Sequence, residues 1–387
     1  MIITLPLVET VKSWFFEHRE DIIAENIAIT EIPAPSWDEH ERALYIAERL
    51  RQLGLQQVET DAADNALGIL AGKGDGPVLL LAAHLDTVFP RGTDLRVRRE
   101  GGLLFAPGVR DNSFGVTSLL WLLRAIRDFS IEFPGRLICV ATAGEEGLGD
   151  LKGMKAVMER FHREVDYVIA VDGGLGGLTI GGITSRRFRI TVNTAGGHSY
   201  GAFGAPSAIH SLGKMIAGIS GIKVPQSPKT TYNVGTVSGG NSVNSIAARA
   251  EMLIDMRSEE REALMSLETE LMQVIETVKK EDGVEVDIEL LGDRPGGATP
   301  ADHPLVEAIQ KVQASLGIAT DTHASSTDAN VPMSYAIPAV TFGCARGGNA
   351  HRIDEWLDTE GMDVGLTQLL LAVAQVMALP SIKATAK

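Results

Sequence analysis

The order of strand-like and helix-like segments constrains the fold of this chain most. Short apolar runs typical of buried strands occupy residues 78–84, 135–142 and 166–171. Segments with a helical period cover residues 9–27, 38–53 and 114–129. Strands that alternate with helices form a largely parallel sheet with helices on both faces. The sequence therefore predicts a three-layer α/β domain.

A second pattern interrupts the first. Its segments are a strand at 186–193, a helix at 205–220, strands at 230–237 and 247–257, a helix at 259–280 and a strand at 284–291. This β-α-β-β-α-β order is the ferredoxin-like pattern. The α/β pattern then resumes with a helix at 302–316, a strand at 338–343 and a helix at 362–378. We expect one α/β domain (1–183 and 295–387) interrupted by an α+β domain (184–294), because 387 residues exceed one ordinary core.

Charge and cysteine content narrow the class of protein. The net charge is −15, from 35 basic and 50 acidic residues, which disfavours nucleic acid or an anionic membrane as a partner. Cys139 and Cys344 lie in apolar contexts without a Cys-x-x-Cys pattern, so we expect reduced core thiols and no thiolate metal site. We find no signal-peptide pattern and no apolar run of membrane-spanning length, and we expect a cytoplasmic protein.

The first strand-like run ends in a His-x-Asp sequence, His84-Leu85-Asp86. A strand that stops there places an imidazole at the carboxyl edge of the sheet. Asp86 points the same way and can accept the other ring N–H, the kind of support that a metal-bound histidine needs.

Four other places along the chain resemble this one. Asp111 precedes a helix, Glu145 and Glu146 follow a strand, Asp172 ends another strand, and His351 closes a glycine-rich loop. Ligand sites in open α/β sheets lie outside the carboxyl ends of the strands. We therefore expect these side chains to share one pocket with His84.

The charge of such a pocket implies cations. Its five carboxylates would be Asp86, Asp111, Glu145, Glu146 and Asp172. Carboxylates that close raise one another's pKa and oppose folding, and two divalent ions remove the conflict. Two histidines and three carboxylates, one of them bridging, suit two zinc ions roughly 3.5–4 Å apart, and the remaining glutamate is free to act as a base.

Each of these residues also has a simpler interpretation. Asp111 could cap the following helix, and Asp172 could open a turn. Paired glutamates are often solvated, His351 could be a satisfied surface residue, and a single His-x-Asp is often structural. Their shared position at strand and loop ends favours one common site over five coincidences.

With these motifs the chain resembles the two-zinc metallopeptidases that include glutamate carboxypeptidase, succinyl-diaminopimelate desuccinylase, acetylornithine deacetylase, aminoacylase and peptidase T. The resemblance covers nearly the whole chain, and its motifs are HLDTV at 84–88, Asp111-Asn112 before a helix, GEEG at 144–147, Asp172 and His351. It implies a three-layer zinc-peptidase catalytic domain with an inserted ferredoxin-like α+β lid and dimerisation domain.

The resemblance also implies how the metal ligands are divided. His84 and Asp172 would bind one zinc ion, Glu146 and His351 would bind the other, and Asp111 would bridge them. Cobalt or manganese are alternatives to zinc.

Two further roles come from the same resemblance. Asp86 would orient His84, and Glu145 would be the general base that acts on a water held by both zinc ions. The family often has a cis peptide bond after the bridging aspartate, here Asp111–Asn112.

Four residues of the inserted domain match family positions. His198, in Gly196-Gly197-His198-Ser199, would stabilise the oxyanion in the active site of a partner subunit. Asn244 matches a lid asparagine and Arg257 a lid arginine, while Arg294 lies where carboxypeptidases bind the substrate's carboxylate. On the residues alone, Arg257 could be a surface charge at a strand end and Arg294 a linker residue.

The implied activity is metal-dependent hydrolysis of an amide bond in a small peptide or an N-acyl amino acid. A carboxypeptidase-type exopeptidase that forms a homodimer through the lid is the main hypothesis. An N-acyl-amino-acid deacylase and a di- or tripeptide aminopeptidase are alternatives on the same scaffold. A non-catalytic binding relative is a third class, and the free Glu145 argues against it.

Overall fold

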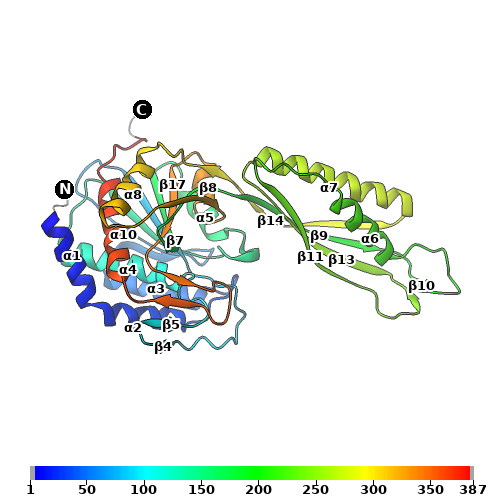
Figure 1. Cartoon of the computed structure of the whole chain (residues 1–387), viewed down its shortest axis with the longest axis horizontal. Coiled ribbons are helices and arrows are strands. Elements are labelled where there is room, and N and C mark those ends of the chain that lie inside the picture. Colours follow the sequence, from blue (N-terminus) through cyan, green and yellow to red (C-terminus); the bar gives the residue numbers. More distant parts are fainter. Residues whose placement is uncertain (1–4, 384–387) are drawn as a thin grey trace. The chain divides into compact units, whose positions relative to one another are not determined.

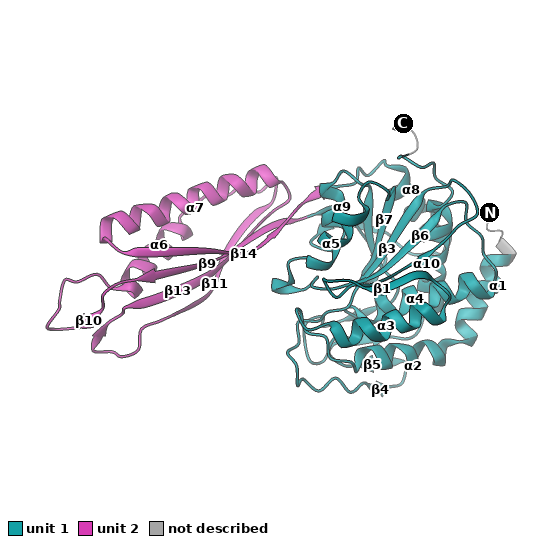
Figure 2. Cartoon of the chain, turned by 180° about the vertical axis from the view of Figure 1, so that it is seen from behind, with its two compact units in different colours: residues 1–182, 298–387 teal, residues 183–297 magenta. Residues whose placement is uncertain are grey.

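The computed structural model describes residues 5–383. The chain forms two compact units, which Figure 2 colours separately. Unit 1 contains the chain up to Gly182 and again from Ala298, and unit 2 is Ile183–Gly297. These boundaries lie one and three residues from those that the sequence suggested.

Unit 1 is built on a nine-stranded sheet (Figure 1). Its order is β1-β2-β6-β3-β7-β17-β8-β15, and β16 pairs with β8. The strands are β1 (Gln56–Thr60), β2 (Ala66–Leu70), β3 (Val78–His84), β6 (Arg136–Thr142), β7 (Tyr167–Leu175), β8 (Gly177–Gly182), β15 (Gly297–Ala298), β16 (Asp321–Ser325) and β17 (Ala339–Gly343). The four neighbours β6, β3, β7 and β17 run parallel, so their carboxyl ends meet at one edge.

Helices cover both faces of this sheet, which confirms the three-layer α/β class. They are α1 (Leu5–Glu17), α2 (Arg19–Thr30), α3 (His40–Gln52), α4 (Ser113–Asp128), α5 (Lys152–Phe161), α8 (Pro304–Ser315), α9 (Asn330–Ser334) and α10 (Met362–Val376), with a 3-10 turn at Gly147–Gly149. Alternate residues of β3 enter different cores. Leu79 and Leu81 pack in the core with α1, α2, α3, α4, α8 and α10, whereas Leu80 and Ala82 pack in the core with α5 and α9.

The expected helix over residues 9–27 is divided into α1 and α2. His18 leaves the helical conformation, with φ −93° and ψ 13°. Its ring Nδ1 lies 2.8 Å from the carbonyl oxygen of Trp14, so the side chain occupies an acceptor at the end of α1.

A small second sheet in unit 1 connects two loops of the chain. Its order is β18-β19-β5-β4, with β4 (Arg98–Glu100), β5 (Leu103–Phe105), β18 (Gly347–Gly348) and β19 (Trp356–Asp358). Because β19 pairs with β5, the segment after Phe105 and the segment before Trp356 lie side by side.

Unit 2 has the ferredoxin-like arrangement. It contains β9 (Thr184–Asn193), α6 (Ala208–Ser220), β11 (Thr230–Gly239), β13 (Arg249–Ser258), α7 (Arg261–Asp282) and β14 (Glu285–Arg294), and a small ladder of β10 (Gly197–His198) with β12 (Ser245–Ile246). The antiparallel sheet has the order β11-β13-β9-β14. Phe188, Ile190 and Val192 of β9 pack in the core shared with α6 and α7. The opposite face of β9 therefore carries no helix of unit 2.

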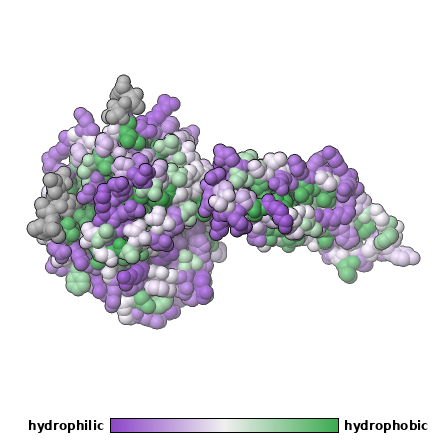
Figure 3. Space-filling model, turned by 45° about the horizontal axis from the view of Figure 1, so that its top comes forward, coloured by the Kyte–Doolittle hydropathy of each residue, from purple (hydrophilic) through white to green (hydrophobic). Residues whose placement is uncertain are grey.

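The face of the molecule seen in Figure 3 is mixed in hydropathy. Figure 3 shows hydrophilic residues spread over the visible face, with hydrophobic residues in smaller patches between them. No helix within residues 5–383 combines the length and the apolar character needed to cross a bilayer. Cys139 and Cys344 are free and buried, as expected.

Candidate metal centre and active site

The expected site residues of unit 1 gather at the carboxyl edge of four neighbouring parallel strands. β3 ends at His84, and Glu145 and Glu146 follow the end of β6. Asp172 lies in β7, just past the last residue of that strand that pairs with β3. His351 follows β17 and the short strand β18. Sequence segments far apart in the chain therefore converge because parallel strands place their ends together.

One group of ligand atoms surrounds His84. Its Nε2 lies 3.1 Å from Asp111 Oδ1 and 3.9 Å from Asp172 Oδ2. The ligand atoms of these three residues all lie within 4.8 Å of one another. His84 is buried, and the side chains of Asp111 and Asp172 are 13% and 19% exposed.

A second group surrounds His351. Its Nε2 lies 2.8 Å from Glu146 Oε1 and 3.5 Å from Asp111 Oδ2. Asp111 thus directs one carboxylate oxygen to each histidine. A third, overlapping group joins His84 with Glu145 and Glu146.

These donors fit two divalent cations. Each of the first two groups supplies one imidazole nitrogen and carboxylate oxygens, and both use Asp111, as a bridging ligand would. Nitrogen and oxygen donors of this kind suit zinc, cobalt and manganese, so the chemistry of the residues supports a pair of metal ions without selecting one metal.

The tautomer of His84 is set by its own strand end. Nδ1 lies 3.0 Å from the carbonyl oxygen of Asp86, which can only accept a hydrogen bond. Nδ1 therefore carries the proton, and Nε2 is left to face Asp111 and Asp172. The nearer carboxylate oxygen of Asp86 is 3.6 Å from Nδ1. Asp86 therefore contacts the ring through its backbone carbonyl, whereas the sequence suggested its carboxylate.

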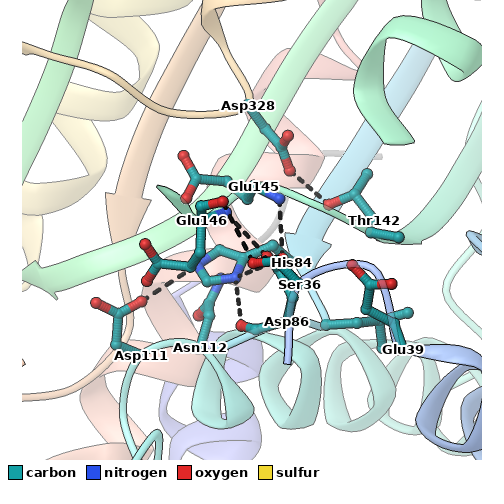
Figure 4. Close-up of polar contacts among 12 residues, drawn as sticks. Ser36, Glu39, His84, Asp86, Asp111, Asn112, Thr142, Glu145, Glu146 and Asp328 are labelled. Atoms are coloured by element: carbon teal, nitrogen blue, oxygen red, sulfur yellow. Dashed lines mark hydrogen bonds and ion pairs between the residues drawn. The ribbon is translucent and has the colours of Figure 1, made fainter. Parts of the chain in front are cut away.

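The Asp86 carboxylate instead holds the two glutamates. It accepts the backbone N–H of Glu145 and of Glu146, each at 2.9 Å, and the hydroxyl of Ser36 at 2.6 Å (Figure 4). Burial opposes ionisation of Asp86, but hydrogen bonding and the charge of His84 lower its pKa below the ordinary value. Asp86 is thus an ionised anchor for the backbone that carries Glu145.

The carboxylate of Glu355 holds the loop that carries Asp111, and the sequence did not predict this contact. This fully buried carboxylate accepts the N–H of Gly108 at 2.9 Å, of Arg110 at 3.0 Å and of Asp111 at 2.8 Å. The next residue, Asn112, caps α4 through a bond from Gly115 N, and the Asp111–Asn112 peptide bond is cis. The only signal in the sequence was a glutamate in an acidic stretch after His351.

Removing the Glu355 carboxylate should loosen Asp111. We expect Glu355→Ala to weaken metal binding about 10- to 100-fold, the usual cost of losing a residue that supports a ligand. Glu355→Gln keeps one acceptor oxygen, so its metal affinity should lie between those of the wild type and Glu355→Ala. Metal titration of both variants tests this, with Glu360→Ala, an exposed glutamate nearby, as the control. Wild-type affinity in Glu355→Ala would contradict the role.

Asp328 also lies at this end of the sheet. Thr142, the last residue of β6, donates its hydroxyl to Asp328 Oδ2 at 2.5 Å (Figure 4). Burial raises the pKa of Asp328 to about 6. The sequence singled out this residue without a role, and the structure connects it to the strand that carries Glu145.

The histidines and carboxylates of the cluster shift one another's pKa. Asp111 and Glu146 raise the pKa of His351 to about 10. Burial would lower the pKa of His84, but Asp111, Asp86 and Asp172 raise it well above the ordinary value. Burial and the charge of Asp111 raise the pKa of Asp172 to about 6.

Metal binding should therefore release protons and strengthen with pH. The neighbouring carboxylates raise the pKa of both imidazoles, and that of His351 to about 10. A ligand histidine must be neutral, so each site competes with a proton that is held more tightly than on an ordinary imidazole. Between pH 7 and 9 we expect the association constant of the ion at His351 to rise up to about tenfold per pH unit, and that of the ion at His84 to rise as well. Calorimetric titrations in buffers of different ionisation enthalpy test this; equal affinity at pH 7 and pH 9 would contradict it.

The structure brings His198 and Asn244 together in unit 2. His198 ends β10 and pairs with Ser245 of β12, and the carbonyl of Asn244 accepts Ser199 N at 3.0 Å. His198 is exposed, and its Nδ1 accepts the N–H of Tyr200 at 3.3 Å and of Gly201 at 3.2 Å. Its Nε2 is therefore the ring atom left to donate a hydrogen bond.

Arg257 and Arg294 share one row of the unit 2 sheet. Both pair in register with Ser185, from the two strands that flank β9. Directly opposed residues of antiparallel strands point to the same face, so the two arginines lie roughly 9–10 Å apart on the face without helices. Arg257 Nε also donates to Asp255 at 2.7 Å, whereas Arg294 is buried.

Two histidines, one of them buried, and several buried or half-buried carboxylates gather at the carboxyl edge of this α/β sheet, an arrangement suited to a metal-dependent hydrolase. A family model described as peptidase family M20/M25/M40 matches residues 80–375, and the chain belongs to this family. Metal-dependent peptidases and deacylases make up the family, which confirms the resemblance seen in the sequence.

Proteins of known name are similar to this chain over most of its length. A succinyl-diaminopimelate desuccinylase of Corynebacterium glutamicum is 25% identical over 362 residues, which cover 88% of this chain and 94% of that protein. Among solved structures, a tripeptidase of Staphylococcus aureus has a TM-score of 0.80 at 23% identity, covering 93% of this chain and 99% of its own. A dinuclear metal-binding peptidase of Bacillus subtilis has a TM-score of 0.69 at 18% identity, covering 95% and 99%.

Proposed function

We propose that this protein is a zinc-dependent exopeptidase of the carboxypeptidase type, which hydrolyses the amide bond of a small peptide or N-acyl amino acid. The observation that carries the proposal is the arrangement around Asp111. Two groups of ligand atoms share this carboxylate, while Glu145, held by its backbone beside them, belongs to neither. The solved M20 peptidase of Bacillus subtilis is named as dinuclear, in agreement with two ions here.

His84, Asp172 and Asp111 would hold one ion, and Asp111, Glu146 and His351 the other. When bound, two divalent ions lower the pKa of a water molecule and polarise a carbonyl oxygen. Glu145 accepts the proton of the attacking water and returns it to the leaving amine, the two steps of general base and general acid catalysis. Asp86 keeps Glu145 in place for both steps by fixing its backbone N–H.

His198 is the proposed donor to the oxyanion, through Nε2. We expect His198→Ala to lower kcat about 10²- to 10³-fold, the usual cost of one lost oxyanion donor. Metal content should stay at the wild-type value because His198 belongs to unit 2 and to neither ligand group. His210→Ala, an exposed histidine of the same unit, is the matched control. An unchanged kcat in His198→Ala would remove the role.

Arg257 and Arg294 are the proposed unit 2 contacts for a carboxylate of the substrate, with Asn244 as a further polar contact. Their shared row on the helix-free face supports a common task. A planar guanidinium can bind a carboxylate through two parallel hydrogen bonds.

Two other activities on this scaffold compete with the proposal. The relative named a desuccinylase supports an N-acyl-amino-acid deacylase, and the solved tripeptidase supports an aminopeptidase. A panel of dipeptides, tripeptides and N-acyl amino acids, each with a free and an amidated carboxyl terminus, tests the three together. The proposal expects peptides with a free carboxyl terminus to be preferred. Equal rates for amidated peptides would favour an aminopeptidase, and hydrolysis of acyl amino acids alone would favour a deacylase.

We further propose a cytoplasmic homodimer formed through unit 2. Within the described residues β11 is an edge strand whose outer side pairs with no other strand, and exposed strand edges favour pairing with a second chain. Free buried cysteines agree with a reducing compartment. Sedimentation of the purified protein and fractionation of cells test the two statements.

A further inference from the structure

Arg110 places a fixed positive charge at the rim of the acidic cluster. It directly precedes Asp111, and its Nη2 lies 3.9 Å from Asp111 Oδ2, the oxygen that faces His351. Its charge also acts on Asp172. The side chain is 12% exposed, so the guanidinium is held in the wall of the site and does not extend into solvent.

Contacts along the loop fix this side chain. The backbone N–H of Arg110 donates to Glu355 at 3.0 Å. Gly347, in the loop that leads to His351, packs against the side-chain stem: a Cβ there would lie 2.3 Å from Arg110 Cδ and 2.5 Å from the carbonyl oxygen of Trp356. A side chain at position 347 would therefore clash with the stem of Arg110, and glycine avoids this clash.

The guanidinium of Arg110 has unused hydrogen-bond donors. Among residues 5–383, no group accepts a hydrogen bond from its nitrogens, and Nε is buried. The Asp111 oxygen at 3.9 Å is beyond hydrogen-bond length. Buried donors without an acceptor are costly, and a guanidinium offers five N–H groups in a planar fork that matches a carboxylate.

We propose that Arg110 binds a carboxylate of the substrate on the His351 side of the metal cluster. This inference rests on the proposed function and adds to it a specificity-determining residue of the catalytic unit, for substrates whose free carboxylate lies close to the scissile amide. The arginine belongs to the catalytic unit itself, so this recognition is independent of Arg257 and Arg294 in unit 2.

A binding experiment with metal-loaded protein tests the inference. N-acetyl-glycine, N-acetyl-leucine, N-acetyl-glutamate and N-acetyl-lysine, each with its carboxamide counterpart, are titrated calorimetrically into the Glu145→Gln variant, which should bind them with little turnover. We expect each acid that binds to be preferred over its amide about 10- to 100-fold, as expected for hydrogen bonds to a charged group. Adding Arg110→Gln should remove most of this preference, and adding Arg110→Lys should retain more of it.

Matched variants separate this role from charge balance. Arg346→Gln removes the same charge from an exposed position of the neighbouring loop and should keep the preference. Metal content is measured for every variant, because an arginine that only balances the cluster would change metal affinity and leave the ratio of acid to amide affinity unchanged.

The inference is overturned if the protein shows no preference for acids, or if Arg110→Gln keeps the wild-type preference, whatever Arg257→Gln and Arg294→Gln do. Hydrolysis of the ligands by Glu145→Gln at the wild-type rate, seen by chromatography after the titration, would contradict the proposed function instead, so the two failures are distinguishable.

Discussion

Replacing Glu145 with glutamine should lower kcat about 10²- to 10⁴-fold, the range that one general acid-base group contributes. The substitution keeps the size of the side chain and removes only its ability to take a proton. The backbone N–H at this position still donates to Asp86, so the loop should keep its shape. Steady-state kinetics and metal analysis on the same preparation test the expectation.

The neighbouring glutamate provides the matched control. Glu146 lies 2.8 Å from His351 and belongs to the second ligand group, so Glu146→Gln should lose metal as well as activity. Glu145 also forms a group with His84 and Glu146. If Glu145→Gln loses metal to the same extent as Glu146→Gln, then Glu145 is a ligand and the general base must be sought elsewhere.

Replacing Asp111 with asparagine should have the larger effect, because this residue serves both groups. One oxygen lies 3.1 Å from His84 Nε2 and the other 3.5 Å from His351 Nε2. Asparagine has the same shape but one acceptor oxygen and no charge, so it cannot replace the shared ligand. We expect both ions to be lost together, with activity below detection at a metal concentration that saturates the wild type.

A second buried aspartate controls for the effect on folding. Asp166 lies at the amino end of β7, where its carboxylate accepts Val78 N at 2.8 Å and Ser381 Oγ at 2.9 Å. Asp166→Asn should lower the free energy of unfolding by about 1–3 kcal/mol and leave metal content unchanged. If Asp111→Asn kept one tightly bound ion, the shared position of Asp111 would be wrong.

The sequence predicted the parts of the site that follow from strand ends. His84, Glu145 and Asp172 each stand after a short apolar run, and the ends of parallel strands must meet at one edge. The alternation of strands and helices predicted the α/β class and the ferredoxin-like order of unit 2 in the same way, because both depend on local periodicity. Local patterns were therefore sufficient to predict the parts of the fold that are built from regular strands and helices.

Local patterns could not predict contacts between segments that are far apart in the sequence. Glu355 binds N–H groups 244 to 247 residues away, and nothing local marks it as the anchor of the Asp111 loop. Asp86 was expected to use its carboxylate on His84, but that carboxylate is occupied by Glu145, Glu146 and Ser36. The position of the Arg110 side chain likewise depends on Gly347, which lies in β18 and pairs with Leu357 of β19. These details come from how loops pack, and periodicity does not encode loop packing.

The most direct test of the account is the number and position of the metal ions. Crystals of protein loaded with zinc should give two anomalous-scattering peaks, one among His84, Asp111 and Asp172 and the other among Asp111, Glu146 and His351. A single ion, ions bound elsewhere, or protein that takes up no divalent metal would contradict the account.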